Sequence, residues 1–298
     1  MKRTIKVSLL LSFSLWGCTP KTAPSMVDST KSAAVIYKGD SRQEISTQNP
    51  SEATVAKAIA VMFSPDKLKN LSPSRYTLKT YRLSEGYPLC PNERFLEQPL
   101  LGHCTASLIA PNKVLTAAHC MDSKNSCDEA RLIFGWNKDK AATLEVSESE
   151  IYKCKSILKM EQTLKGIDYS IIELDRPVTG VTPLIVAKNT DALVPGTKLL
   201  SLSYPLGLPL KKDMAVVLSN DKARTNFKVE VDTFKGSSGS PLLNAQGEIV
   251  GILSTGMDDI LEDDIYRVQR EGGCINFNTC ATGTCFGETF FKVDRIDL

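Results

Sequence analysis

The hexapeptide Gly236-Ser237-Ser238-Gly239-Ser240-Pro241 decides the fold when it is taken with two segments upstream. These are residues 116–120, Thr-Ala-Ala-His-Cys, and residues 168–174, Asp-Tyr-Ser-Ile-Ile-Glu-Leu. A serine hydroxyl is a weak nucleophile at neutral pH, so it needs a base within hydrogen-bond reach and a third group that orients the base. The three segments offer Ser238, His119 and Asp168 for these roles, and together they predict an activated serine.

Each segment taken alone has a simpler interpretation. Ser-Gly-Ser runs are common in turns, so the hexapeptide by itself predicts a plain turn equally well. His119 could be a hydrogen-bonded structural histidine, and Asp168 could cap a strand. The chain has only two histidines, however, and the other one, His103, is expected at the surface. The apolar run after Asp168 predicts a buried strand, which would bring this carboxylate into the start of the core.

The order of the three residues along the chain points to a family. His, Asp and Ser follow one another in the chymotrypsin order, which differs from the orders in subtilisin and the α/β-hydrolases. Residues 35–45, Val-Ile-Tyr-Lys-Gly-Asp-Ser-Arg-Gln-Glu-Ile, also match the opening of the mature domain in bacterial relatives. The chain thus resembles the trypsin-like serine peptidases, and their bacterial glutamyl-endopeptidase (V8-like) branch more than the animal digestive enzymes. This resemblance implies an all-β fold of two packed six-stranded antiparallel β-barrels, with the active site in the cleft between them.

The resemblance also implies the activity, a serine endopeptidase that acts on a protein or peptide substrate. Ser238 would attack the peptide carbonyl, His119 would carry the proton, and Asp168 would orient the imidazole. The backbone N–H groups of Gly236 and Ser238 would form the oxyanion hole. Residues 248–256 would pair with the substrate backbone, and Ser254, Thr255 and Gly256 would form one wall of the specificity pocket.

The predicted specificity depends on Asp232 and its neighbour Thr233. Asp232 lies six residues before Ser238, where trypsin carries the acid that selects Lys and Arg, so a preference for basic residues is predicted. The run Asp-Thr-Phe is also a pattern of the V8-like branch, in which this aspartate need not confer that preference. Leu253 stands where glutamyl specificity requires a histidine, and this disfavours cleavage after glutamate.

The N-terminus predicts export. Lys2, Arg3 and Lys6 precede an apolar run, residues 7–16, that is too short to span a bilayer. Residues 15–18, Leu-Trp-Gly-Cys, resemble a bacterial lipobox in which Cys18 carries the lipid; ordinary secretion is the alternative. The predicted location is therefore the bacterial cell envelope, by lipid anchor to a membrane, or the medium.

Three segments follow from this interpretation: a lipoprotein signal peptide at 1–17, a flexible tether or pro-segment at 18–34, and the peptidase domain at 35–298. The first barrel is expected over about 50–180 and the second over about 181–298. Ser237 replaces the aspartate of the trypsin activation switch, so that switch is absent. The two alanines before Val35 suit a processing site instead.

The nine cysteines suit an oxidising compartment, because assigning Cys18 to a lipid leaves eight for disulfides. The resemblance implies a Cys104–Cys120 bridge, and a loop of this length contributes about 3 kcal/mol in the chain-entropy model. Cys127 and Cys154 could also pair. This leaves Cys90, Cys274, Cys280 and Cys285, of which the last three offer zinc ligands as an alternative to disulfides.

Composition and charge restrict the other functions. Short apolar runs at 58–63, 131–136, 198–204 and 215–218, separated by Gly, Pro, Asn and Asp, are typical of an all-β barrel protein. With 36 basic and 34 acidic residues, the chain gives no electrostatic reason to expect nucleic-acid binding. A monomer without cofactor or metal is expected. The rival function is a catalytically weak, surface-tethered binding module on the same fold.

Overall fold

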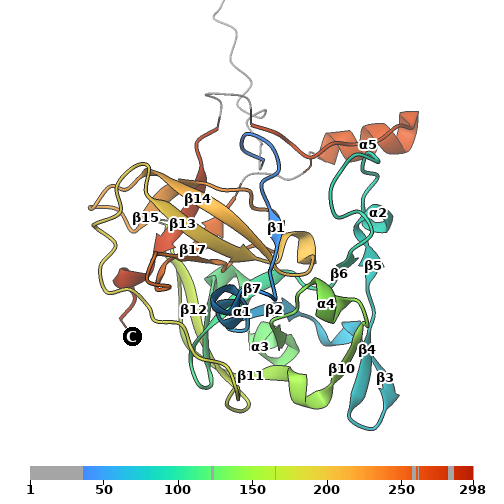
Figure 1. Cartoon of the computed structure of the whole chain (residues 1–298), viewed down its shortest axis with the longest axis horizontal. Coiled ribbons are helices and arrows are strands. Elements are labelled where there is room, and N and C mark those ends of the chain that lie inside the picture. Colours follow the sequence, from blue (N-terminus) through green and yellow to red (C-terminus); the bar gives the residue numbers. More distant parts are fainter. Residues whose placement is uncertain are drawn as a thin grey trace, which may run out of the picture. The chain divides into compact units, whose positions relative to one another are not determined.

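The computed structural model describes residues 36–121, 124–164, 166–256, 260, 262–280 and 285–297. The predicted signal peptide, tether, lipidated Cys18 and processing site before Val35 lie outside the described residues. Six antiparallel strands close the first barrel in the order β11-β12-β8-β7-β2-β9 (Figure 1). Their bounds are Ile59–Phe63 (β2), Cys104–Ala110 (β7), Lys113–Thr116 (β8), Arg131–Phe134 (β9), Ile151–Gln162 (β11) and Asp168–Leu174 (β12).

The second barrel follows in the chain and also has six antiparallel strands. Its order is β14-β13-β16-β17-β18-β15, and a β14–β15 pairing closes it. The strands are Lys198–Ser203 (β13), Lys211–Ser219 (β14), Asn226–Glu230 (β15), Pro241–Leu243 (β16), Ile249–Thr255 (β17) and Glu288–Lys292 (β18). The N-terminal strand β1, Gln43–Glu44, pairs with β14 rather than with the first barrel. Two closed six-stranded barrels confirm the predicted fold class.

The remaining elements are short and lie outside the barrels. Within the described residues they comprise two small sheets, β10-β4-β3 and β5-β6, five helices and five 3₁₀ turns. Their bounds are Leu68–Ser72 (β3), Arg75–Leu78 (β4), Tyr81–Arg82 (β5), Pro99–Leu100 (β6), Glu145–Ser147 (β10), Pro50–Ala56 (α1), Leu83–Gly86 (α2), Lys124–Glu129 (α3), Lys138–Ala141 (α4), Glu262–Glu271 (α5), Pro65–Lys67 (η1), Ala118–Met121 (η2), Glu148–Glu150 (η3), Pro205–Gly207 (η4) and Val293–Arg295 (η5).

Several barrel strands lie at the predicted apolar runs, and burial explains the two patterns that the strands show. All five residues of β2, Ile-Ala-Val-Met-Phe, are buried, so this strand is apolar throughout. In β15, Asn-Phe-Lys-Val-Glu, buried and partly exposed residues alternate, because successive side chains point to opposite faces of the sheet. The apolar runs at 58–63, 131–136, 198–204 and 215–218 all contain or fall within barrel strands.

Aromatic side chains join the two barrels. The rings of Tyr169 on β12 and Phe291 on β18 stack with centroids 5.2 Å apart. Tyr204, fully buried just after β13, donates a hydrogen bond of 3.0 Å from its hydroxyl to the backbone carbonyl of Ile59 on β2. One continuous apolar core therefore runs from the first barrel into the second and fixes their relative position.

We expect Tyr204→Phe to lower the free energy of unfolding by roughly 1 kcal/mol, the net value of one hydrogen bond. The loss stays small because the carbonyl of Ile59 also accepts the N–H of Gly135, at 2.8 Å. Urea unfolding measures the change, with the half-exposed Tyr81→Phe as the control. Equal stability of the two variants would show that the Tyr204 hydroxyl does not help to hold the barrels together.

Candidate active site

His119 and Asp168 are brought together by the pairing of two strands. His119 lies in the turn η2 directly after β8, and Asp168 is the first residue of β12. The two strands pair antiparallel with Ser170 opposite Thr116. This register brings Asp168, two residues before Ser170, next to the turn that follows Thr116. Asp168 Oδ2 lies 2.8 Å from His119 Nδ1, and Asp168 Oδ1 accepts the backbone N–H of His119 at 3.1 Å. The carboxylate therefore fixes the orientation of the imidazole.

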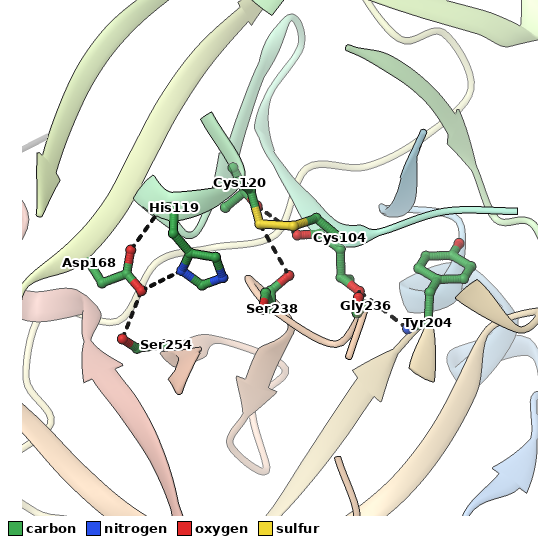
Figure 2. Close-up of a disulfide and its surroundings, with 10 residues drawn as sticks. Cys104, His119, Cys120, Asp168, Tyr204, Gly236, Ser238 and Ser254 are labelled. Atoms are coloured by element: carbon green, nitrogen blue, oxygen red, sulfur yellow. Dashed lines mark hydrogen bonds and ion pairs between the residues drawn. A yellow bond between two sulfur atoms is a disulfide. The ribbon is translucent and has the colours of Figure 1, made fainter. Parts of the chain in front are cut away.

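The Asp168 carboxylate is buried and receives a further donor from the second barrel. Ser254 Oγ, on β17, donates to Asp168 Oδ2 at 2.8 Å (Figure 2). Burial acts to raise the pKa of Asp168, but the hydrogen bonds and charge interaction with His119 and the hydrogen bond from Ser254 hold that pKa below its usual range. Asp168 is therefore a carboxylate at neutral pH and can stabilise an imidazolium.

Ser238 lies across the imidazole ring from Asp168 (Figure 2). Among the described residues, no hydrogen bond joins its hydroxyl to His119; such bonds often form only when substrate binds. The loop that carries Ser238 is held by the first barrel, because Thr105 on β7 donates its backbone N–H to the Ser238 carbonyl at 2.8 Å. Thr105 Oγ1 donates to the Gly236 carbonyl at 2.9 Å.

Gly236 can occupy its position only because it lacks a side chain. Its φ is +89°, and a Cβ would lie 2.7 Å from the carbonyl oxygen of Tyr204 and 3.0 Å from the Gly207 nitrogen. Within the part of the chain that the structure describes, the backbone N–H groups of Gly236 and Ser238 donate to no other group. Two backbone donors beside Ser238 are thus available to a developing oxyanion.

The disulfides support this site. Cys104 on β7 is bonded to Cys120, the residue after His119, as predicted (Figure 2). The predicted Cys127–Cys154 bridge is also present. The remaining cysteines of the domain form the bridges Cys90–Cys274 and Cys280–Cys285, so their sulfurs are not available as zinc thiolates.

Asp232 has partners that differ from those of an open pocket floor. It is buried, and its two oxygens accept the backbone N–H groups of Tyr37 and Ser41, each at 2.7 Å. Burial raises the pKa of Asp232 to about 6, and the nearby Asp213 carboxylate adds to the rise. The carboxylate predicted to bind a substrate side chain therefore anchors the N-terminal segment of the domain.

The other predicted pocket residues lie near one another, with one addition. A Cβ on Gly256 would lie 2.6 Å from Glu288 Oε2 and 3.3 Å from Thr233 Oγ1. Thr233 and Glu288 are buried, whereas Thr255 is exposed. Ser254 donates its hydroxyl to Asp168 and also lines the groove between the two barrels. Glu288 carries no sequence signal, since only the pairing of β18 with β17 brings it there.

A groove of about 570 Å³ opens beside His119 and Asp168, between the two barrels. His119, Asp168, Ser254 and Thr255 line it on one side. The hairpin between β11 and β12 and the side chains of Arg224, Asn226, Lys228 and Thr289 complete it. No sequence motif indicates Arg224, Asn226, Lys228 or Thr289, because only the pairing of β15 with β18 brings residues 224–228 and Thr289 together.

Comparison with known proteins agrees with this geometry. The family model of the trypsin-like peptidase domain matches residues 104–252, a range that contains all three candidate catalytic residues. The cercarial protease of Schistosoma mansoni is 26% identical over 186 residues, which make up 52% of this chain and 70% of that protein.

Solved structures share the fold at low sequence identity. The Vibrio cholerae VesB protease has a TM-score of 0.51 and 15% identity, over 88% of this chain and 64% of that one. A Glu endopeptidase (TM-score 0.51, 18% identity) is matched over 87% and 93%, and the human heparin-binding protein (0.51, 14%) over 85% and 91%. Since the family model covers half of its length, the chain belongs to the trypsin-like peptidase domain family.

Proposed function

We propose that this protein is a serine endopeptidase that cleaves peptide bonds through an acyl-enzyme, with Ser238, His119 and Asp168 as its triad. The observation that carries the proposal is the buried Asp168 carboxylate, which accepts from His119 Nδ1 at 2.8 Å while Ser238 lies on the other side of the ring (Figure 2). Membership of a peptidase family makes a protein or peptide the substrate.

In the proposed mechanism the Ser238 oxygen attacks the carbonyl carbon and its proton moves to His119 Nε2. The imidazolium that forms is stabilised by Asp168, which stays ionised. The carbonyl oxygen becomes an oxyanion and accepts hydrogen bonds from the N–H groups of Gly236 and Ser238. His119 then gives this proton to the amine nitrogen as the C–N bond breaks, which leaves the acyl group on Ser238. A water molecule gives a proton to His119 and attacks the acyl carbonyl, and His119 returns the proton to the Ser238 oxygen as the acid is released.

We further propose that the protein is exported, with Cys18 as its lipid anchor and a tether at 18–34. The four disulfides support an oxidising compartment. Among the described residues, no helix is both long and apolar enough to cross a membrane. The bacterial origin, the V8-like branch and the monomeric state belong to the same proposal and rest on the sequence motifs.

A fluorophosphonate probe tests the proposed nucleophile. We expect the probe to label the oxidised protein at Ser238, because only a serine with an adjacent base reacts readily. Mass spectrometry of the digested adduct locates the site. Ser238→Ala and His119→Ala should both remain unlabelled, and the far-UV circular dichroism of each should match the wild type. Correctly oxidised, processed protein that is not labelled would favour the alternative, a catalytically weak binding module.

The Ser254 hydroxyl should assist catalysis through Asp168. We expect Ser254→Ala to raise the pKa of Asp168 and to lower kcat on a peptide substrate by about tenfold, the value of one hydrogen bond to a charged group. Asp168→Asn should lower kcat by about 10⁴-fold. The matched control is Ser107→Ala, since the buried Ser107 hydroxyl makes no hydrogen bond within the described residues. A Ser254→Ala rate equal to that of the control would leave Ser254 without a catalytic role.

The Lys or Arg preference predicted from Asp232 gains no support from the contacts of that carboxylate, so the proposal assigns Asp232 to anchoring residues 37–41. We expect Asp232→Ala to lower the free energy of unfolding by about 3 kcal/mol, because two backbone N–H groups lose a charged acceptor. The ratio of cleavage after Lys and Arg to other cleavage should not change. Urea unfolding and peptide digests measure the two effects. A selective loss of cleavage after Lys and Arg at unchanged stability would return Asp232 to the pocket floor.

A further inference from the structure

The groove beside His119 differs in charge from the rest of the site. Its lining includes two cationic side chains, Arg224 and Lys228, and one carboxylate, Asp168. The oxygens of Asp168 already accept three hydrogen bonds, from His119 and Ser254. The groove therefore presents positive charge to any peptide that enters it.

Lys228 is placed to bind an anion. Its Nζ donates to Thr289 Oγ1 at 2.6 Å and to the Gly287 carbonyl at 3.2 Å, which uses two of its three donors. No carboxylate forms an ion pair with Lys228 in the described part of the chain. Burial lowers the pKa of Lys228, although the Glu288 charge opposes this effect. A partly desolvated ammonium with a remaining donor favours an acidic partner.

Arg224 adds a second, more exposed cation. Its nearest acid is Asp221, with 3.5 Å between Nε and Oδ2, and both side chains are largely exposed, 74% and 58%. Surface pairs of this kind contribute little, so Arg224 can turn to a better partner at small cost. Together the two cations can hold one carboxylate from two directions.

The position of the groove determines which part of a substrate reaches it. Thr255, at the end of β17, lines the groove together with His119. From the family resemblance we expect the substrate backbone to pair with residues 248–256, so the residues that precede the scissile bond pass over the groove. An extended chain advances about 3.3 Å per residue, which puts side chains within about four residues of the cut above the two cations.

We infer that Lys228 and Arg224 select substrates with an aspartate or glutamate within about four residues before the scissile bond. This inference rests on the proposed function and adds a substrate class to it: acidic peptides recognised beside the catalytic histidine. The contact is electrostatic, so it favours acid over amide at the same position and weakens as salt screens the charges.

To test the inference, the oxidised full chain digests a library of tryptic peptides that is prepared from a proteome. Mass spectrometry then identifies the cut sites. We expect enrichment of Asp and Glu before the cut. For the best peptide and its Glu→Gln or Asp→Asn analogue, kcat/KM should differ by about tenfold at low salt and by less at 0.5 M salt. In the double variant Lys228→Met/Arg224→Gln the ratio should approach one.

Lys198→Met, a change at an exposed lysine on β13 outside the groove, is the matched control and should keep the wild-type ratio. Fluorophosphonate labelling of Ser238 at an unchanged rate shows that each variant is folded. Labelled wild type that cleaves peptides without acidic enrichment, or whose acid-to-amide ratio survives in the double variant, overturns the inference alone. Labelled wild type that cleaves no peptide contradicts the proposed endopeptidase activity as well. Wild type that is neither labelled nor active overturns the proposed function, and the inference falls with it.

Discussion

The structure depends on the hydrogen bonds that the buried Asp168 carboxylate accepts. An ionised Asp168 away from water would cost several kcal/mol if it had no partners. It has three donors, and they come from both barrels: His119 supplies two from the first, and Ser254 supplies one from the second. The same contacts that make the buried charge tolerable therefore align the two barrels and orient the imidazole. Tyr169, the next residue along β12, strengthens this junction by stacking on Phe291.

The nucleophile loop is held by the same kind of cross-barrel contact. Thr105 donates from β7 to the carbonyls of Gly236 and Ser238, and the Cys104–Cys120 bridge ties that strand to the turn that carries His119. Strand β7 and the turn η2, two short segments of the first barrel, thus position both His119 and Ser238. The carbonyls of Lys235 and Ser237, which share peptide groups with the N–H of Gly236 and of Ser238, accept the backbone N–H groups of Leu206 and Ser240. The two N–H groups themselves donate to no other group in the described part of the chain, so they are available to an oxyanion.

Sequence motifs predicted the features that depend on local residue types, such as strands. They missed the contacts between residues that are far apart in the chain. The apolar runs predicted strands because burial requires them, and the Cys104–Cys120 pair followed from the family resemblance. The hydrogen bond from Ser254 to Asp168 joins residues 86 positions apart, and no sequence pattern near either residue predicts it. Asp232 was misleading for the same reason, since Tyr37 and Ser41, 195 and 191 positions away, take up its oxygens.

The N-terminal segment of the domain, residues 37–41, contributes contacts to the candidate site. Tyr37 connects two buried acids, since its backbone N–H donates to Asp232 at 2.7 Å and its hydroxyl donates to Glu288 Oε1 at 3.0 Å. Glu288 lies against Gly256, so this one residue links the segment to the wall of the predicted pocket. Ser41 completes the anchor through Asp213, whose Oδ1 accepts the Ser41 hydroxyl at 2.6 Å. Tyr37 stands two positions after Val35, before which processing is predicted, and its two donors help to offset the cost of burying Asp232 and Glu288. We therefore expect the predicted processing before Val35 to affect the candidate pocket through these contacts, without the aspartate switch that Ser237 replaces.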